Sequence, residues 1–284
     1  MKNNERKIWT RKKRKVNPVH YLILSVWSLI VLFPVWTMLV NSLKKQLDIF
    51  RNPFAFPIRP NFDGYLYVIR ASDFLLYCWN TLLVVTLTIF VTLLVGSLAA
   101  FALANWKGKA SKIVYLLFLS GIMIPIRLGT INIFQIIRAL NLMGSMYSLV
   151  PVYVAWCLPI AIFVLTTFIQ ELPGELMEVA ALDGASCLRI YYSIILPLIR
   201  PALGTVAILN LVNIWNDIWF PLIFNLKESH RTLLLGVTYF FGTYQTDWTK
   251  VLVVLTLATV PILTLYILMS RQFIEGLTAG AIKG

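Results

Sequence analysis

The apolar stretch 202–224 carries four polar side chains that could bind a ligand: Asn210, Asn213, Asn216 and Asp217. If the stretch is a helix, positions 210, 213 and 217 share one face. Polar groups within apolar spans are costly and usually face a protein interior or water. Amides pair with hydroxyl groups, and the indoles of Trp215 and Trp219 could cover the apolar face of a sugar ring. Hydrogen bonding between helices is the alternative interpretation, and both stay open.

A second polar region, Glu171–Pro201, lies between two apolar segments. We expect a helix from Pro173 to Asp183, because proline suits a first helical turn. Gly184 suits the left-handed position that ends a helix, and Ser186 can cap the next helix. Acidic side chains dominate the first helix at positions 171, 175, 178 and 183. Anionic lipid would repel them, so this hairpin is predicted to bind a soluble partner rather than lie on the membrane surface.

The spacing within the hairpin predicts which faces are used. Small side chains at Met177, Ala180, Ala181 and Gly184 form one face, on which a partner's backbone could approach closely. In the second helix, residues 188, 191 and 195 form an apolar stripe, and prolines at 197 and 201 redirect the chain. A rigid hairpin attached to two apolar helices can transmit a partner's movement to them.

Other chemical sites are not indicated. A phosphate-binding P-loop needs G-x-x-x-x-G-K-[ST], but Gly108-Lys109 is followed by Ala110 and lacks the upstream glycine. The two histidines are isolated, and the three cysteines have no metal-ligand spacing. We therefore expect no catalytic residue, no metal site and no cofactor bound by this chain.

The composition indicates a membrane protein, since 59% of the residues are hydrophobic and 13% are charged. A helical span needs about 20 mostly apolar residues. Six segments qualify, which predicts an all-α integral membrane protein with one domain over residues 21–269: Tyr21–Val40, Phe74–Leu103, Ile113–Ile133, Leu149–Ile169, Ala202–Phe224 and Val251–Met269.

The positive charge of +13 is explained by topology rather than by nucleic-acid binding. About a third of the Lys and Arg residues precede residue 16, directly ahead of the first span. We expect residues 1–20, the hairpin at 171–201 and a tail at 270–284 on the cytoplasmic side. The basic outer loop from Lys44 to Asp73 does not follow this rule. An outer amphipathic helix is expected over Phe134–Tyr147, with Arg127 reaching the lipid headgroups.

The hairpin also matches a known signature. It resembles the "EAA" loop of permease subunits of binding-protein-dependent ABC importers, which reads Glu-Ala-Ala, three residues, Gly, nine residues, Ile, one residue and Leu-Pro. Val179 replaces the central alanine, and the matching positions are Glu178, Ala180, Gly184, Ile194, Leu196 and Pro197. Two stretches, Trp215–Phe224 and Gly276–Gly284, are similar to the maltose-type second permease of the carbohydrate branch.

The resemblance implies a type I ABC importer permease fold in the bacterial cytoplasmic membrane, with a cytoplasmic coupling-helix loop. It implies a second homologous permease, an extracytoplasmic solute-binding protein that delivers sugar, and two ATPase subunits that hold the ATP and magnesium. The residues that would dock into the ATPase are Glu178, Ala180, Ala181, Asp183, Gly184 and Ala185.

Other functions stay open. An ABC permease could carry another small solute such as an amino acid, phosphate or a metal, although the two carbohydrate-branch stretches oppose this. An ion-coupled secondary transporter would need carboxylates within the spans, where Asp217 is the only one. A membrane enzyme would need a catalytic set that the sequence does not offer.

Overall fold

The protein is described by a computed structural model that covers residues 18–106, 108–224, 226–238 and 246–281. These residues form helices and connecting segments, with no strand among them. Four helices are individually long and apolar enough to cross a membrane, and six spans result if each of two bent helix pairs is one span. The four are α1 (Pro18–Ser42), α4 (Phe74–Asn105), α7 (Leu149–Gln170) and α14 (Trp248–Ala281).

The third predicted span is not one straight helix. Helix α5 (Lys109–Met123) is followed by the 3-10 turn η1 (Ile126–Gly129) and by α6 (Thr130–Ala139), with a 90° bend between the two parts. Pro125 causes the break, because proline disfavours the helical conformation of the preceding residue, and Ile124 is extended with ψ 115°. The predicted outer helix at 134–147 is also wrong in its bounds. Asn141 and Gly144 have positive φ and turn the chain after α6.

The fifth predicted span is shorter than expected. Helix α11 (Arg200–Trp215) ends before Asn216, and the chain resumes as the short helix α12 (Trp219–Ile223). The Asp217 carboxylate accepts hydrogen bonds from the backbone N–H groups of Trp219 and Phe220, at 3.4 and 3.2 Å. A side chain that binds the backbone two and three residues ahead starts a new helix and competes with continuation of the old one.

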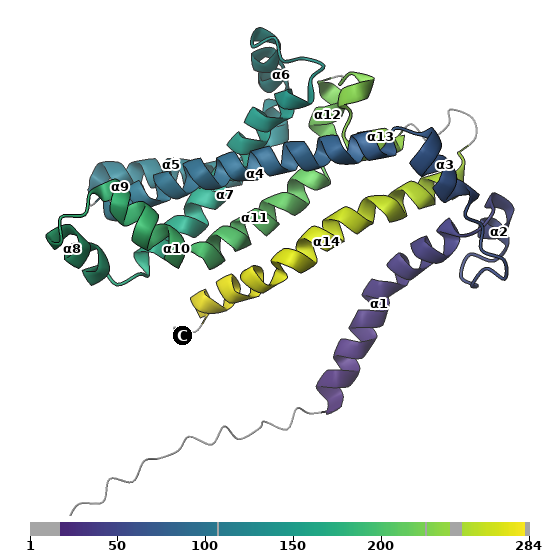
Figure 1. Cartoon of the computed structure of the whole chain (residues 1–284), viewed down its shortest axis with the longest axis horizontal. Helices are drawn as coiled ribbons and strands as arrows, with labels where there is room; N and C mark the ends of the chain where they lie inside the picture. The colour runs from purple at the N-terminus through teal and green to yellow at the C-terminus, as the bar shows by residue number, and fades with distance from the viewer. Residues whose placement is uncertain (1–17, 107, 225, 239–245, 282–284) are drawn as a thin grey trace, which may run out of the picture.

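The bundle is built around two helix pairs. Helix α4 packs most extensively on α7, and α11 packs on α14, with α7 also contacting α5 (Figure 1). Gly96 in α4 permits the first pairing, since a Cβ built on it would lie 3.2 Å from the Cβ of Ala161. The remaining elements are α2 (Gln46–Arg51), α3 (Asp63–Ala71), η2 (Met146–Ser148), α8 (Glu175–Leu182), α9 (Cys187–Ile190), η3 (Tyr191–Ile195), α10 (Leu196–Leu198), η4 (Glu228–His230) and α13 (Leu233–Val237).

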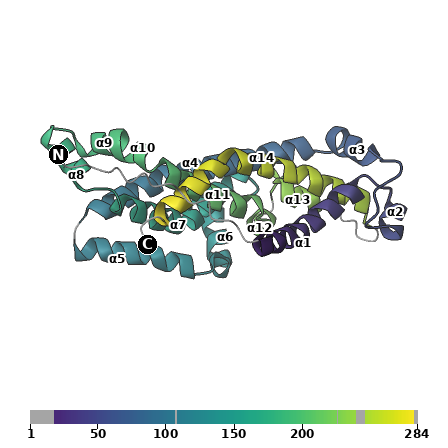
Figure 2. The ribbon, with the colours of Figure 1, turned by 90° about the horizontal axis from the view of Figure 1, so that it is seen from below.

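The two ends of the bundle are different. Helices α8, α9 and α10 lie at one end, toward which α14 also descends, while α2 and α3 lie at the other end in both views (Figures 1 and 2). The tail expected from residue 270 is not a separate segment, because α14 continues to Ala281. The basic residues before residue 18 and the last three residues lie outside the described part.

Helix α1 leans away from the bundle and touches it mainly through α14 (Figure 1). Its buried residues are confined to the last turn, Val40 to Ser42. Large apolar side chains such as Leu22, Trp27 and Leu29 are about two-thirds exposed, at 66%, 65% and 69%. An apolar surface of this size requires lipid or another protein chain against it.

Lys44 is a basic residue of the loop that follows α1, which the sequence predicts to be an outer loop. Its side chain is buried, and its ammonium donates to Asn41 Oδ1 at 2.8 Å and to the carbonyl of Asn52 at 2.7 Å. Burial lowers the pKa of Lys44, while the nearby Asp48 raises it. This lysine therefore fastens the loop to the end of α1.

Candidate functional site

The hairpin after α7 folds as a capped helix and a bent continuation. Helix α8 spans Glu175–Leu182, two residues later than expected at its start. Gly184 has φ 77°, which confirms the predicted left-handed position. The N–H of Ala185 donates to the carbonyl of Ala180, and the N–H of Gly184 to that of Ala181. These two bonds form the Schellman motif, which satisfies the last carbonyls of a helix.

The predicted second helix is also present. The Ser186 hydroxyl accepts the N–H of Arg189 at 3.3 Å, which confirms the predicted cap. Helix α9 then passes through the π-helical turn η3 and α10, and the chain bends by 71° at Ile199 before α11. Pro197 lies within this run rather than ending it, and Pro201 lies in the first turn of α11.

The hairpin is fixed to the bundle by an apolar cluster. Tyr191, Ile195 and Ile199 are almost fully buried, and they pack with residues of α4 and α7. The Tyr191 hydroxyl lies 2.7 Å from Ser97 Oγ in α4, and its ring centroid lies 5.4 Å from that of Phe101. These contacts join the hairpin rigidly to α4, and close-packed contacts transmit strain.

One residue of the predicted docking face is buried within the hairpin. Ala180 packs into the hairpin's own cluster at 8% exposure, so it is not available to a partner. The outward face instead carries Leu176, Val179 and Leu182, exposed by 42%, 57% and 87%. Among the other predicted docking residues, Ala185 is half-buried. The remaining four are exposed: Glu178, Ala181, Asp183 and Gly184.

A hollow of about 520 Å³ lies between the end of α5, the middle of α7 and α11. Its volume is within the range of small-molecule sites. Apolar residues form most of its wall, with Trp156, Arg127, Asn210 and Asn213 as the side chains that can recognise polar groups. Asn210 Nδ2 is buried and has no hydrogen-bond partner among the described residues. An unpaired buried donor costs about 1–3 kcal/mol, so this amide calls for a partner.

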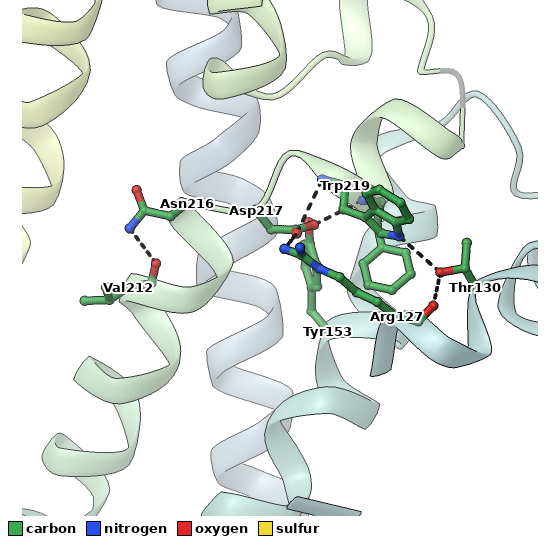
Figure 3. Close-up of polar contacts among 8 residues, drawn as sticks. Arg127, Thr130, Tyr153, Val212, Asn216, Asp217 and Trp219 are labelled. Atoms are coloured by element: carbon green, nitrogen blue, oxygen red, sulfur yellow. Dashed lines mark hydrogen bonds and ion pairs between the residues drawn. The ribbon is translucent and has the colours of Figure 1, made fainter. Parts of the chain in front are cut away.

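Beside the hollow, the break between α11 and α12 organises a polar cluster (Figure 3). Asp217 is buried and accepts the Tyr153 hydroxyl at 2.8 Å in addition to two backbone N–H groups. Arg127 approaches Asp217 at 3.8 Å, and its guanidinium carbon lies 5.6 Å from the centroid of Trp219. The Trp219 indole N–H donates to Thr130 Oγ1 at 3.1 Å, which ties α12 to α6.

The structure divides the four predicted pathway residues. Asn210 and Asn213 line the hollow, while Asp217 is buried behind it and does not belong to the helical face that the sequence predicted. Asn216 points away from Asp217, and its amide donates to the Val212 carbonyl at 2.9 Å (Figure 3).

Three residues of this region were not predicted to act together: Arg127, Tyr153 and Trp156. That Arg127 reaches the lipid headgroups stays a prediction, and the break at Pro125 brings its guanidinium to 3.8 Å from Asp217. The proline beside an isolated arginine was the signal in the sequence, but its partner on another helix was not visible there. No cluster of three or more metal-ligating side chains is found within the described ranges.

Comparison with known proteins places this architecture among transport proteins. Residues 92–278 match the family described as binding-protein-dependent transport system inner membrane component. The chain is 35% identical to the ABC transporter permease protein ORF2 of Caldicellulosiruptor sp. (strain Rt8B.4), over 93% of this chain and 96% of that protein. It is 26% identical to the diacetylchitobiose uptake system permease protein NgcG of Streptomyces coelicolor, over 95% and 90%.

A solved structure has the same fold. It is the crystal structure of a bacterial ABC transporter involved in the import of the acidic polysaccharide alginate. The TM-score is 0.79 at 18% sequence identity, and the alignment covers 94% of this chain and 100% of that one.

Proposed function

The chain belongs to the family of binding-protein-dependent transport system inner membrane components, and from that membership we propose how its parts serve import. It is a multi-pass inner-membrane permease subunit of an ABC importer and is not itself the catalyst. We propose that the hairpin formed by α8 and α9 lies in the cytoplasm and docks into an ATPase subunit. We also propose that the hollow beside Asn210 and Asn213 is part of a pathway for a sugar or oligosaccharide.

The docking proposal rests on the outward face of α8. Leu176, Val179 and Leu182 are exposed although the same helix is fixed from behind by Ala180. A helix that presents apolar side chains to water at the end of a rigid hairpin suits a hydrophobic groove. Glu175 and Glu178 flank this face and favour a groove with basic residues at its rim.

The docking proposal can be tested by photo-crosslinking in intact cells. A benzophenone amino acid at Leu182 should form a covalent product with an ATPase subunit, which mass spectrometry identifies. The same probe at Ile58, which is 98% exposed at the opposite end of the bundle, is the matched control. Products with lipid alone at Leu182, or the ATPase product at Ile58, would contradict the proposal.

The proposed orientation places both termini and the hairpin in the cytoplasm. Cys187 is a native probe for this, because it is the exposed cysteine of the hairpin, whereas Cys78 is half-buried and Cys157 is buried. An impermeant maleimide should label Cys187 only after the cells are opened. A cysteine introduced at Ile58 should be labelled in intact cells. The opposite pattern would reverse the proposed topology.

The remaining subunits follow from the same proposal. A second homologous permease would complete the pathway and cover exposed apolar surface such as that of α1. Two ATPase subunits would hold ATP and magnesium, and an extracytoplasmic solute-binding protein would deliver the sugar. Purification of the tagged chain in mild detergent should recover these subunits. Recovery of the permease without any ATPase would contradict the assembly.

Sugar is supported as the substrate by the chemistry of the hollow. Asn210 and Asn213 offer amides to hydroxyl groups, and the Trp156 indole can lie against a sugar ring. Relatives that transport saccharides add to this support. An ion-coupled mechanism is less suited, because the Asp217 oxygens already accept three hydrogen bonds. Cells that lack the chain should lose oligosaccharide uptake and regain it on complementation, and unchanged uptake of every saccharide would refute the sugar assignment.

A further inference from the structure

We propose that the hollow selects saccharides that carry an acid group, such as a carboxylate, and that Arg127 binds this group. The inference rests on the proposed function and narrows its substrate class. Relatives do not decide the matter, because one carries diacetylchitobiose and a protein of the same fold carries an acidic polysaccharide.

The charge of the hollow is the first support. Of the described residues that line it, Arg127 is the one that carries a charge. Asp217, whose carboxylate lies 3.8 Å from Arg127, is buried at 5% exposure and is not part of the lining. A ligand in the hollow therefore meets a cation before it meets an anion. This order favours an anionic ligand over a cationic one.

Asp217 lies close to Arg127 but does not occupy its hydrogen-bond donors. Their closest nitrogen and oxygen are 3.8 Å apart, which exceeds the length of a hydrogen bond. Asp217 is instead satisfied by the hydroxyl of Tyr153 and by two backbone N–H groups. The Arg127 side chain remains 63% exposed. Its planar fork of donors is thus accessible to a carboxylate, for which guanidinium is well matched.

The surroundings of Arg127 restrict its position. Its guanidinium lies over the Trp219 ring, and Trp219 is itself tied to Thr130 by a hydrogen bond. Both contacts hold the cation at the edge of the hollow, which Arg127 lines. A preorganised cation binds an anion at a lower entropic cost than a mobile one.

The other polar groups of the hollow complement this cation. Asn210 contributes a buried donor with no partner among the described residues, and Asn213 contributes an exposed amide on the same helix. Trp156 adds an indole to the wall. Together they provide donors for ring hydroxyls and an aromatic surface, while Arg127 alone distinguishes an acidic sugar from its neutral counterpart.

The test compares acidic saccharides with the same saccharides after their carboxylates are reduced to alcohols. Oligosaccharides released from pectin, alginate and glucuronoxylan serve as the probes, each with its carboxyl-reduced form. Uptake by cells that lack the native chain and express a variant is measured by mass spectrometry, per molecule of permease in the membrane. The variants are Arg127→Gln, Arg127→Lys and, as a matched control, Arg138→Gln on the exposed surface of α6.

We expect the native protein to import acidic oligosaccharides. Arg127→Gln should lower this uptake about 10- to 100-fold at limiting concentration, since it removes a charge-assisted hydrogen bond. It should change uptake of any reduced form less than two-fold. Arg127→Lys should retain part of the acidic uptake because it keeps the charge but loses the fork. Arg138→Gln should match the native protein.

Several outcomes would overturn the proposal. Import of reduced forms alone by the native protein would exclude an acidic substrate. An equal loss of acidic and reduced uptake in Arg127→Gln would assign Arg127 to folding or lipid contact. If only acidic forms are imported, equal activity of Arg127→Gln and Arg127→Lys refutes the role of the charge. A failure of the proposed function is distinguishable, because loss of the chain would then leave the uptake of every saccharide unchanged, neutral ones included. Dependence of neutral saccharide uptake alone on the chain would overturn only the acidic-ligand proposal.

Discussion

Gly184 offers the sharpest test of the hairpin as a docking element. A Cβ built on this residue meets no atom within 4 Å, so a larger side chain would not clash. The penalty of a substitution comes from the backbone, because φ is 77°. Holding an ordinary residue in the left-handed region costs about 1–2 kcal/mol, and a β-branched residue is at or above the upper end. At about 1.4 kcal/mol per tenfold, Gly184→Val should lower the equilibrium constant for the docking conformation roughly 30-fold.

Gly174→Val provides the matched control in the same hairpin. Gly174 also has no atom within 4 Å of a built Cβ, but its φ of −58° and ψ of −29° are ordinary helical values. This substitution should therefore leave the hairpin intact. Gly184→Asn should weaken the docking conformation less than Gly184→Val does, since asparagine tolerates the left-handed region.

Substrate uptake and ATPase activity should be measured in membrane vesicles, with the amount of permease determined by immunoblotting. We expect Gly184→Val to remain in the membrane, because the helices on either side are held by the apolar cluster around Tyr191. Its uptake should fall by an order of magnitude or more, while Gly174→Val stays near the native rate. Native uptake in Gly184→Val, or equal losses in both variants, would refute the reasoning.

Two further predictions concern the pathway and the packing of the bundle. Asn213→Ala should raise the half-saturation concentration for sugar several-fold with little change in stability, because Asn213 lines the hollow and is exposed. Asn216→Ala, away from the hollow, is the control, and equal effects of the two substitutions would favour a packing role. Gly96→Leu should destabilise the α4–α7 contact by about 1–3 kcal/mol, because the Cβ of Ala161 lies 3.2 Å from a Cβ built on Gly96. Thermal unfolding in detergent measures this loss of stability, and an unchanged midpoint would contradict the close approach.

The sequence by itself determined the four spans that are single helices, the capped hairpin and the Schellman glycine, because these depend on local composition and on backbone preferences. Hydropathy indicates which segments are apolar and long enough to cross a bilayer, and Gly184 and Ser186 act on neighbouring backbone groups. The EAA spacing is likewise contiguous in the chain, so it could be read without any knowledge of tertiary contacts.

Only the tertiary structure decided which faces are used. The face of α8 that carries small side chains was expected to receive a partner, but Ala180 packs on the hairpin's own cluster. Leu176, Val179 and Leu182 are exposed instead. Asp217 was assigned to the pathway by helical periodicity, yet its contacts with Tyr153 and Arg127 join helices 64 and 90 residues away in the chain. Such contacts depend on how bent helices meet in space, and helical periodicity within one segment does not predict which residue of another helix lies against it.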